Sequence, residues 1–221
     1  MIGILGGTFD PVHLGHLRTA VELREALGLE EVRLLPCGTP PHREPPVASG
    51  ADRLAMLEAA IAGEPGLAVD TRELERPGPS YMVDTLASFR AELGPGRPLC
   101  LLLGTDALAG LARWHRWRRI PELAHLVVAR RPGADLPAAG AVGELLAARR
   151  VENVEPLREA PVGRILVRDV TLLDISATRI RALLAQGRSV RYLVPEAVLE
   201  FIHARGLYGE GATRAGRPAR R

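Results

Sequence analysis

The order of apolar segments along this 221-residue chain predicts an α/β fold, a doubly wound parallel sheet with helices on both faces. Three observations lead to this prediction. Short apolar segments of strand length alternate with longer segments whose apolar residues recur at helical spacing. Strands separated by helices pair in parallel through right-handed crossovers. The length and a 47% share of apolar residues suit one domain with a sizeable core.

The first half of the chain predicts four strands and three helices. The strands are expected over residues 2–5, 31–36, 67–74 and 98–104. The helices are expected over 14–27, 51–62 and 81–93, the first ending at Gly28 and the second capped by Ser49 or Asp52. A proline-rich loop over 37–50 separates the second strand from the second helix. The strand over 98–104 is the most apolar one and is expected at the centre of the sheet.

The second half of the chain predicts the remaining elements and a tail. We expect a helical stretch around Trp114, a strand and turn over 124–133, a helix with irregular chain over 134–160, and a strand over 164–174. Two further helices, over 176–187 and 195–206, each end at glycine. Residues 1–208 then form one Rossmann-like domain, and residues 209–221 form a basic tail that we expect to be disordered.

Composition argues against several classes of protein. No apolar run reaches the roughly 18 residues of a membrane span, and the N-terminal segment lacks the features of a secretory signal. Two cysteines, Cys37 and Cys100, are too few for a disulfide framework, which favours the cytoplasm. The tail holds four arginines and one acid, so subtracting it from the 29 basic and 26 acidic residues leaves 25 of each. The net charge of +3 therefore does not indicate a nucleic-acid surface.

The segment GGTFDPVHLGHL, residues 6–17, is the most informative one in the chain. Gly6 and Gly7 allow a ligand to approach the backbone closely at the end of the first strand. The helix that follows offers unpaired N–H groups and a partial positive charge, which suit a phosphate. His13 and His16 are three residues apart and share one face of the first helical turn. Two imidazoles at this place can stabilise charge that grows on a phosphoryl group.

Two other interpretations of the histidine pair stay open at this stage. The histidines can be structural, as single histidines on helices usually are. They can also bind zinc together with Asp10, with Cys37 and His42 as additional ligands. The sequence Asp10–Pro11 is more typical of a turn that begins a helix. Neither the Walker-type loop nor the dinucleotide-binding fingerprint occurs here.

The same segment resembles the HxGH signature of the nucleotidyltransferase superfamily, whose members transfer a nucleotidyl group and release pyrophosphate. Four further segments resemble motifs of its nicotinate mononucleotide adenylyltransferase family, together with a similar C-terminal helix over 192–208. These segments are PCGTPPHR (36–43), SYMVDTL (80–86), LGTDALAGLARWHRW (103–117) and DISATRIR (174–181). Arg43 stands where the family usually has Lys, Met82 where it has Thr, and Ala177 where it has Ser. An arginine presents a planar fork where lysine presents a point charge, so the geometry at the substrate phosphate can differ.

The resemblance implies roles for individual residues. For catalysis it implies His13, His16 and Arg43, with His16 steadying the five-coordinate α-phosphate. For ATP binding it implies Gly6, Gly7, Thr8, Phe9, His13, His16, Gly104, Asp106, Ile175, Ser176, Thr178 and Arg179. For nicotinate mononucleotide it implies His42, Arg43, Asp84, Thr85, Trp114 and Arg131. Trp114 suits this task because it can stack on a pyridine ring, whereas Trp117 is more typical of a core residue.

The reaction implied by the resemblance joins ATP and nicotinate mononucleotide into deamido-NAD and pyrophosphate. Mg²⁺ is expected to come with ATP, held by phosphates and water because the protein offers few acids for it. A pantetheine-phosphate adenylyltransferase, a nucleotide-binding regulatory module and a metal-dependent hydrolase are the alternatives. No partner nucleic acid or membrane is expected, and the sequence leaves open whether the chain forms a homo-oligomer.

Overall fold

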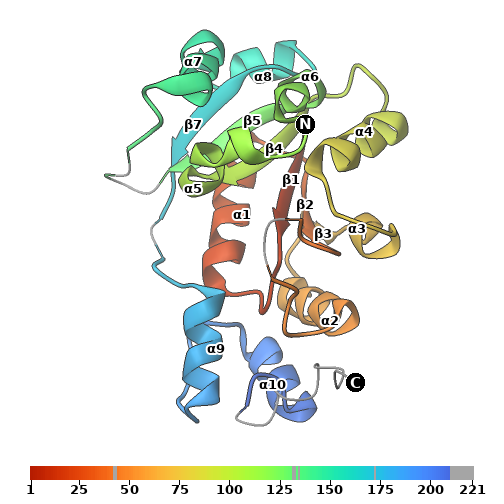
Figure 1. The fold of residues 1–221 in the computed structure, drawn as a ribbon, viewed down its shortest axis with the longest axis vertical. Helices are drawn as coiled ribbons and strands as arrows, with labels where there is room; N and C mark the ends of the chain where they lie inside the picture. The colour runs from red at the N-terminus through yellow and green to blue at the C-terminus, as the bar shows by residue number, and fades with distance from the viewer. Residues whose placement is uncertain (42–43, 131–132, 134, 172, 210–221) are drawn as a thin grey trace, which may run out of the picture.

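The computed structural model describes residues 1–41, 44–130, 133, 135–171 and 173–209. They form one seven-stranded parallel sheet with the strand order β3-β2-β1-β4-β5-β7-β6, flanked by helices (Figure 1). The strands are β1 (Ile2–Gly7), β2 (Glu31–Pro36), β3 (Leu67–Val69), β4 (Leu99–Gly104), β5 (His125–Arg130), β6 (Arg150–Val151) and β7 (Ile165–Asp169). The predicted fold class is confirmed, and β4 lies at the centre of the sheet as expected.

Helices connect the strands and form the end of the domain. The longer ones are α1 (Leu14–Leu27), α2 (Gly50–Ile61), α4 (Met82–Leu93), α7 (Gly140–Arg149), α9 (Ala177–Ala185) and α10 (Glu196–Arg205). The shorter ones are α3 (Arg72–Glu75), α5 (Thr105–Ala109), α6 (Ile120–Leu123), α8 (Glu155–Glu159) and the 3₁₀ turns η1 (Leu111–Arg113) and η2 (Trp117–Arg119). In the described part of the chain, no helix combines the length and the hydropathy needed to cross a bilayer.

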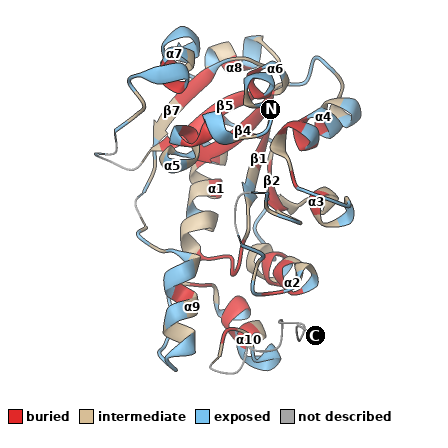
Figure 2. Ribbon diagram, viewed as in Figure 1, coloured by how far each residue is buried: buried red, intermediate tan, exposed pale blue. Residues whose placement is uncertain are grey.

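Two apolar cores cover the two faces of the sheet, as Figure 2 shows by the buried strands between partly exposed helices. Side chains alternate along β4, so Leu99, Leu101 and Leu103 join one core while Cys100 and Leu102 join the other. The first core includes residues of α4, α5, α6 and α7, and the second includes residues of α1, α2, α8, α9 and α10. A central strand with both faces covered needs a continuous apolar sequence, which explains the segment LCLLLG.

The strand order reverses between β1 and β4, and this reversal locates the site. Strands β2 and β3 follow β1 toward one edge, whereas β5, β7 and β6 follow β4 toward the other. The helices after β1 and β4 therefore leave on opposite faces and open a crevice between the carboxyl ends of these strands. The register places Leu102 opposite Leu5, so both strands reach this crevice side by side.

Local signals explain the helix boundaries that agree with the sequence prediction. The helix over 14–27 ends at Gly28, which adopts the left-handed conformation with φ 63°. Ser49 caps α2 by accepting a hydrogen bond from the Asp52 N–H group, which decides between the two predicted caps. Gly206 ends α10 in the same left-handed conformation as Gly28.

Several predicted boundaries are wrong. The strand over 67–74 ends at Val69, because Arg72–Glu75 forms a short helix. The strand predicted over 164–174 ends at Asp169. The strand and turn predicted over 124–133 agree with β5, which ends at Arg130. The short strand β6 was not predicted, since two residues carry no periodicity. Apart from Gly209, the predicted tail lies outside the described residues.

Candidate active site

The chain turns sharply after β1, and we call residues 6–13 the glycine turn. Gly6 and Gly7 are closely packed, so a side chain at either position would have to displace a neighbouring side chain. A Cβ atom on Gly6 would lie 2.9 Å from the Met82 methyl group, and one on Gly7 would lie 3.0 Å from the Phe9 ring. These contacts bring the start of α4 against the glycine turn. The backbone N–H of Cys37 donates to the Gly7 carbonyl at 2.9 Å and so brings the loop after β2 to the same place.

Two histidines at the start of α1 stack on each other. The ring centroids of His13 and His16 are 3.6 Å apart and the planes are inclined by 23°. Phe9 meets the His16 ring at a steep angle of 76°, with centroids 5.0 Å apart. Gly15 leaves space for this arrangement, since a Cβ atom there would lie 3.1 Å from Nδ1 of His13. The spacing of three residues thus brings both imidazoles to one face, as the sequence predicts.

Burial keeps both imidazoles neutral at pH 7. The His13 residue is 6% exposed, and desolvation lowers its pKa from 6.5 to about 4. Desolvation also lowers the pKa of His16 well below 6.5, and the neighbouring His13 lowers it further. The pair therefore offers uncharged hydrogen-bonding groups instead of cations.

The hydrogen bond between the two residues fixes the proton on His16. The backbone N–H of His13 donates to Nδ1 of His16 at 3.3 Å. A neutral imidazole has one donor and one acceptor nitrogen, so acceptance at Nδ1 places the proton on Nε2. The His16 ring is thus held as an Nε2–H donor in an orientation set by the backbone.

The geometry favours a ligand-binding role for the histidine pair over the two other interpretations. Nδ1 of His13 is buried without a hydrogen-bond partner among the described residues, which is typical of a functional site and not of a satisfied core histidine. Asp10 accepts hydrogen bonds on both carboxylate oxygens and would lose them as a zinc ligand. Within the described ranges, no three His, Cys, Asp or Glu side chains are grouped to hold a metal ion. His42 lies outside the described residues.

A second helix, α9, begins beside the glycine turn. Arg181 of α9 donates to the Asp10 carbonyl at 2.6 Å, and the Leu173 carbonyl would lie 3.5 Å from a Cβ atom on Gly15. Ser176 caps α9 by accepting a hydrogen bond from the Arg179 N–H group at 3.2 Å. The N–H groups of residues 177 and 178 have no acceptor in the described part of the chain. Ser176, Thr178 and Arg179 are exposed, and Ile175 is half-buried.

The end of β4 reaches the same crevice. Gly104 is the N-cap of α5, and Asp106 lies exposed in the first turn of that helix. Asp106 is therefore not the cap that the sequence alone suggests as the alternative to a ligand-binding role. A carboxylate in the first turn is favourable with the helix dipole and leaves both oxygens accessible.

The side chain of Thr85, at the start of α4, is already used within the protein. Its side chain is fully buried: the hydroxyl donates to Oε1 of Glu73 at 2.6 Å and accepts from Nη2 of Arg76 at 2.9 Å. The N–H groups of Asp84 and Thr85 bond to the Tyr81 carbonyl. The hydroxyl of Thr85 is thus already used, and an anion at this helix start would meet other N–H groups. Those of residues 82 and 83 have no acceptor among the described residues, and the Asp84 side chain is exposed.

The segment after α5 lies beside the start of α4. Tyr81 stacks on His115 with ring centroids 4.3 Å apart, which places the adjacent Trp114 near this helix start. Trp114 is half-buried and follows η1 with extended backbone, so it does not lie within a helix as predicted. Its partly exposed ring remains available for stacking.

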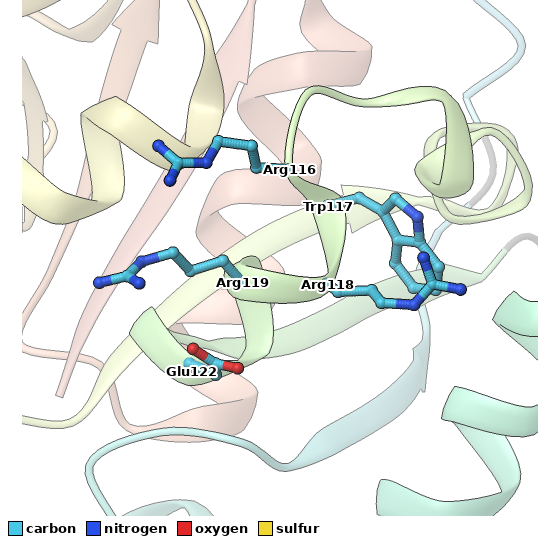
Figure 3. Close-up of a pocket in the computed structure, with 5 residues that line it drawn as sticks. All are labelled: Arg116, Trp117, Arg118, Arg119 and Glu122. Atoms are coloured by element: carbon cyan, nitrogen blue, oxygen red, sulfur yellow. The ribbon is translucent and has the colours of Figure 1, made fainter.

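Trp117 packs at the edge of a core, in partial agreement with its predicted core position, since it is half-buried against the cluster that includes residues of α4 to α7. It also lines a surface pocket of about 320 Å³ with Arg116, Arg118, Arg119 and Glu122. Figure 3 shows Arg116 and Arg119 extending in the same direction while Arg118 lies along the Trp117 ring, with its guanidinium carbon 4.7 Å from the ring centroid. None of the predicted site residues lines this pocket, which is formed by η2, the residue before it and α6.

Some predicted site residues are not placed. His42, Arg43 and Arg131 lie outside the described residues. Arg130, which precedes Arg131 in the chain, pairs with Asp169 through hydrogen bonds of 2.6 and 2.9 Å.

Three buried residues around the site were missed by the sequence reasoning. Arg53 of α2 is 2% exposed and donates to the Thr8 carbonyl at 2.8 Å. Glu73 is buried beside Thr85, and burial raises the pKa of its carboxyl group. Asp10 was considered only as a turn residue or a zinc ligand. The partners of all three come from distant segments, so no local pattern identifies them.

Comparison with known proteins decides the family. Residues 4–183 match the family described as Cytidylyltransferase-like. A protein of Methylococcus capsulatus named "Probable nicotinate-nucleotide adenylyltransferase" is 54% identical over 211 residues, which cover 95% of this chain and all of that protein. The chain belongs to the nicotinate-nucleotide adenylyltransferase family. Another relative with that name, from Chromohalobacter salexigens, is 55% identical and covers 94% of this chain and 95% of its own.

Solved structures of other proteins share the fold of this chain. The nicotinic acid mononucleotide adenylyltransferase of Plasmodium falciparum complexed with NaAD has a TM-score of 0.70 at 16% identity, covering 94% of this chain and 96% of its own. The same enzyme complexed with APC has a TM-score of 0.68. At this identity the likeness concerns the fold.

Proposed function

We propose that this chain transfers the adenylyl group of ATP to nicotinate mononucleotide, giving deamido-NAD and pyrophosphate. The single observation that carries the proposal is the pair of stacked, neutral imidazoles at the start of α1, with His13 buried and His16 half-buried, beside the closely packed glycine turn. Relatives with 54% and 55% identity over nearly the whole chain bear the name of this activity. The cytoplasmic location that the sequence suggests stays a prediction.

The nucleophile is the phosphate of nicotinate mononucleotide itself. One of its oxygens forms a bond to the α-phosphorus of ATP, while the bond from that phosphorus to the bridging oxygen breaks and pyrophosphate leaves with its electron pair. A phosphate monoester has a second pKa of about 6 and is mostly dianionic at pH 7. No general base is therefore needed, and alignment of the two anions contributes most of the acceleration.

His16 is proposed as the donor to the α-phosphate. The hydrogen bond at Nδ1 keeps the proton of His16 on Nε2. The ring stays neutral at pH 7 because the pKa of His16 lies well below 6.5. A donor held in place before reaction stabilises the five-coordinate phosphorus without reorganisation. His13 is proposed to contact the triphosphate from the same face. Arg43 is proposed to contact the phosphates of both substrates.

The β- and γ-phosphates are proposed to lie at the start of α9. The N–H groups of Ala177 and Thr178, the hydroxyl groups of Ser176 and Thr178, and the Arg179 guanidinium group supply the donors. Gly104 and Asp106 are proposed to bind adenosine, with the carboxylate near the ribose hydroxyls. Gly6, Gly7, Thr8, Phe9 and Ile175 complete the proposed ATP site.

Mg²⁺ is proposed to enter with ATP. Within the described residues no group of acidic, histidine or cysteine side chains is arranged to hold an ion, and buried imidazoles are nitrogen ligands, which Mg²⁺ does not prefer. The residues present thus do not form a resident metal site. Phosphate oxygens and water are the proposed ligands, and the roles assigned to the protein residues do not depend on the ion.

The nicotinate group is proposed to lie between Trp114 and the start of α4. The ring stacks on Trp114, and its carboxylate meets the N–H groups of residues 82 and 83 at the positive end of the helix. Asp84 and Thr85 belong to the same helix start. The N–H and the hydroxyl of Thr85 are bonded to the Tyr81 carbonyl and to Glu73, so Thr85 is proposed to hold this helix start in place for the nicotinate group. His42, Arg43 and Arg131 are proposed contacts by resemblance alone.

The test is pyrophosphate release with a panel of acceptors. The purified chain is supplied with ATP and Mg²⁺, with or without zinc, and with nicotinate mononucleotide, nicotinamide mononucleotide or phosphopantetheine. Release that depends on nicotinate mononucleotide supports the proposal. Release with phosphopantetheine instead would favour the pantetheine-phosphate adenylyltransferase. Hydrolysis without acceptor would favour the metal-dependent hydrolase, and binding without turnover would favour the regulatory module.

A further inference from the structure

Asp10 joins the glycine turn to two other segments of the chain. The residue is 3% exposed. Its Oδ2 accepts from the Val47 N–H at 2.8 Å, and its Oδ1 accepts from the Ala48 N–H at 3.0 Å and from the Tyr208 hydroxyl at 2.7 Å. Three donors on one carboxylate fix its orientation, and hydrogen bonds to a charged acceptor are stronger than neutral ones.

Two arginines hold the backbone of the same turn. Nη1 of Arg181 donates to the Asp10 carbonyl at 2.6 Å and lies 3.8 Å from Oδ2. Nη1 of Arg53 donates to the Thr8 carbonyl at 2.8 Å. Both arginines come from helices, α9 and α2, so the turn that carries the histidines is attached to two rigid elements.

Tyr208 reaches Asp10 from the far end of the chain. It lies three residues beyond the end of α10, is 4% exposed and adopts a left-handed backbone with φ 63°. Its segment is anchored separately, because the Leu207 N–H donates to the Ile202 carbonyl and Arg205 pairs with Asp52 of α2 at 3.0 Å. Burial and the Asp10 carboxylate raise the pKa of the Tyr208 phenol, so the hydroxyl stays a donor.

We propose that Asp10, Val47, Ala48 and Tyr208 form a clamp that aligns the histidine pair with the loop before α2, with Tyr208 as its positioning residue. The proposal rests on the proposed function, because that loop includes His42 and Arg43. Without the hydroxyl, Asp10 loses one of its three donors, and the link between the turn and residues 47–48 loosens. A transferase that depends on aligning two anions is sensitive to such a displacement.

The experiment compares Tyr208→Phe with Tyr192→Phe. Tyr192 is a matched control, since it also has a left-handed backbone, with φ 67°, but is 81% exposed. Hydrogen exchange of the Val47 and Ala48 amides is measured together with kcat and KM. In Tyr208→Phe we expect these amides to exchange roughly tenfold faster and kcat to fall roughly tenfold, with KM for ATP within about twofold. Tyr192→Phe should match the wild type in all three.

Asp10→Asn tests the same clamp from its centre and should give larger changes in the same direction. If this variant does not fold, Tyr208→Phe still decides. Faster exchange confined to residues 202–208 with unchanged kcat would overturn the clamp, because Tyr208 would then hold only its own segment. A wild-type protein without adenylyl transfer would refute the proposed function, while the exchange of residues 47 and 48 would still report on the clamp.

Discussion

The two helices that begin beside the glycine turn differ in how they meet the polyphosphate proposed there. Helix α1 presents two imidazoles that are packed against each other and kept neutral by burial. Helix α9 presents hydroxyl groups and the guanidinium of Arg179, all exposed. Both starts carry the partial positive charge of a helix N-terminus, but α1 offers fewer N–H groups, because Leu14 donates to the Leu193 carbonyl and His16 to the His13 carbonyl. The same backbone feature therefore occurs once in a buried and once in a solvated setting.

Their different exposure gives the two helix starts different tasks within one site. A buried neutral donor is already oriented and already desolvated, so it can act on charge that appears only in the transition state. An exposed cation attracts the charge that ATP carries from the start, and salt screens it. We therefore expect α1 to determine kcat and α9 to determine the affinity for ATP.

The largest expected effect is that of His16→Ala. Loss of one preorganised donor costs about 2.7–4 kcal/mol, so kcat should fall roughly 100- to 1000-fold with little change in KM. Pyrophosphate release under saturating substrates measures this. His203→Ala, on the exposed side of α10, serves as the control and should keep wild-type kcat. Near-normal turnover by His16→Ala would contradict the assignment of kcat to α1, because α1 would then have no special part in the chemical step.

The next effect concerns stability against pH. The pKa of His13 is about 4 in the folded protein and near 6.5 in the unfolded chain. As the pH falls, the unfolded chain therefore binds the proton first. The contribution of His13 to stability is complete above pH 6.5 and is lost between pH 6.5 and about 4, a change of about 3 kcal/mol.

Urea unfolding at a series of pH values measures this loss. The wild type should lose stability over that interval more steeply than His13→Asn, whereas His203→Asn should follow the wild type. Parallel curves for the wild type and His13→Asn would show that His13 is not kept neutral by burial.

A smaller effect is expected for the choice between acid and amide substrates. Nicotinamide mononucleotide lacks the carboxylate that the N–H groups of residues 82 and 83 are proposed to hold. Hydrogen bonds to a charged group contribute about 1.5–3 kcal/mol, so kcat/KM should favour the acid at least roughly tenfold. Parallel assays with the two substrates measure the ratio. Equal rates would show that the start of α4 does not bind the carboxylate.

The sequence predicts the parts of the fold whose signals are local. The helix over 14–27 and the strand over 31–36 agree with the structure to the residue, because amphipathic periodicity and Gly28 mark their ends. The strand predicted over 67–74 is too long, because the two residues before Arg72 lead into a short helix. The apolar pattern of residues 67–74 does not reveal this helix. Tertiary contacts set that boundary.

The candidate site divides in the same way. The histidine pair is recognisable because its spacing and its glycines lie within one segment. The bond between Asp10 and Tyr208 joins residues 198 positions apart, and the bond of Thr85 to Glu73 depends on how α3 packs beside α4. Neither contact leaves a pattern in the sequence, so the residues that orient the site were found only in the folded structure.

The smallest expected effect is that of Arg179→Gln. Since Arg179 is exposed, its attraction for the triphosphate is screened, and its loss should raise KM for ATP about five- to tenfold while kcat stays within about twofold. Arg188→Gln is the matched control, an exposed arginine beyond the end of α9.

Measuring KM for ATP at increasing salt further separates the role of Arg179 from that of His16. KM of the wild type should rise with ionic strength and that of Arg179→Gln should rise less, because one screened contact is already gone. A fall in kcat as large as that of His16→Ala would show that the exposed helix start also acts on the transition state.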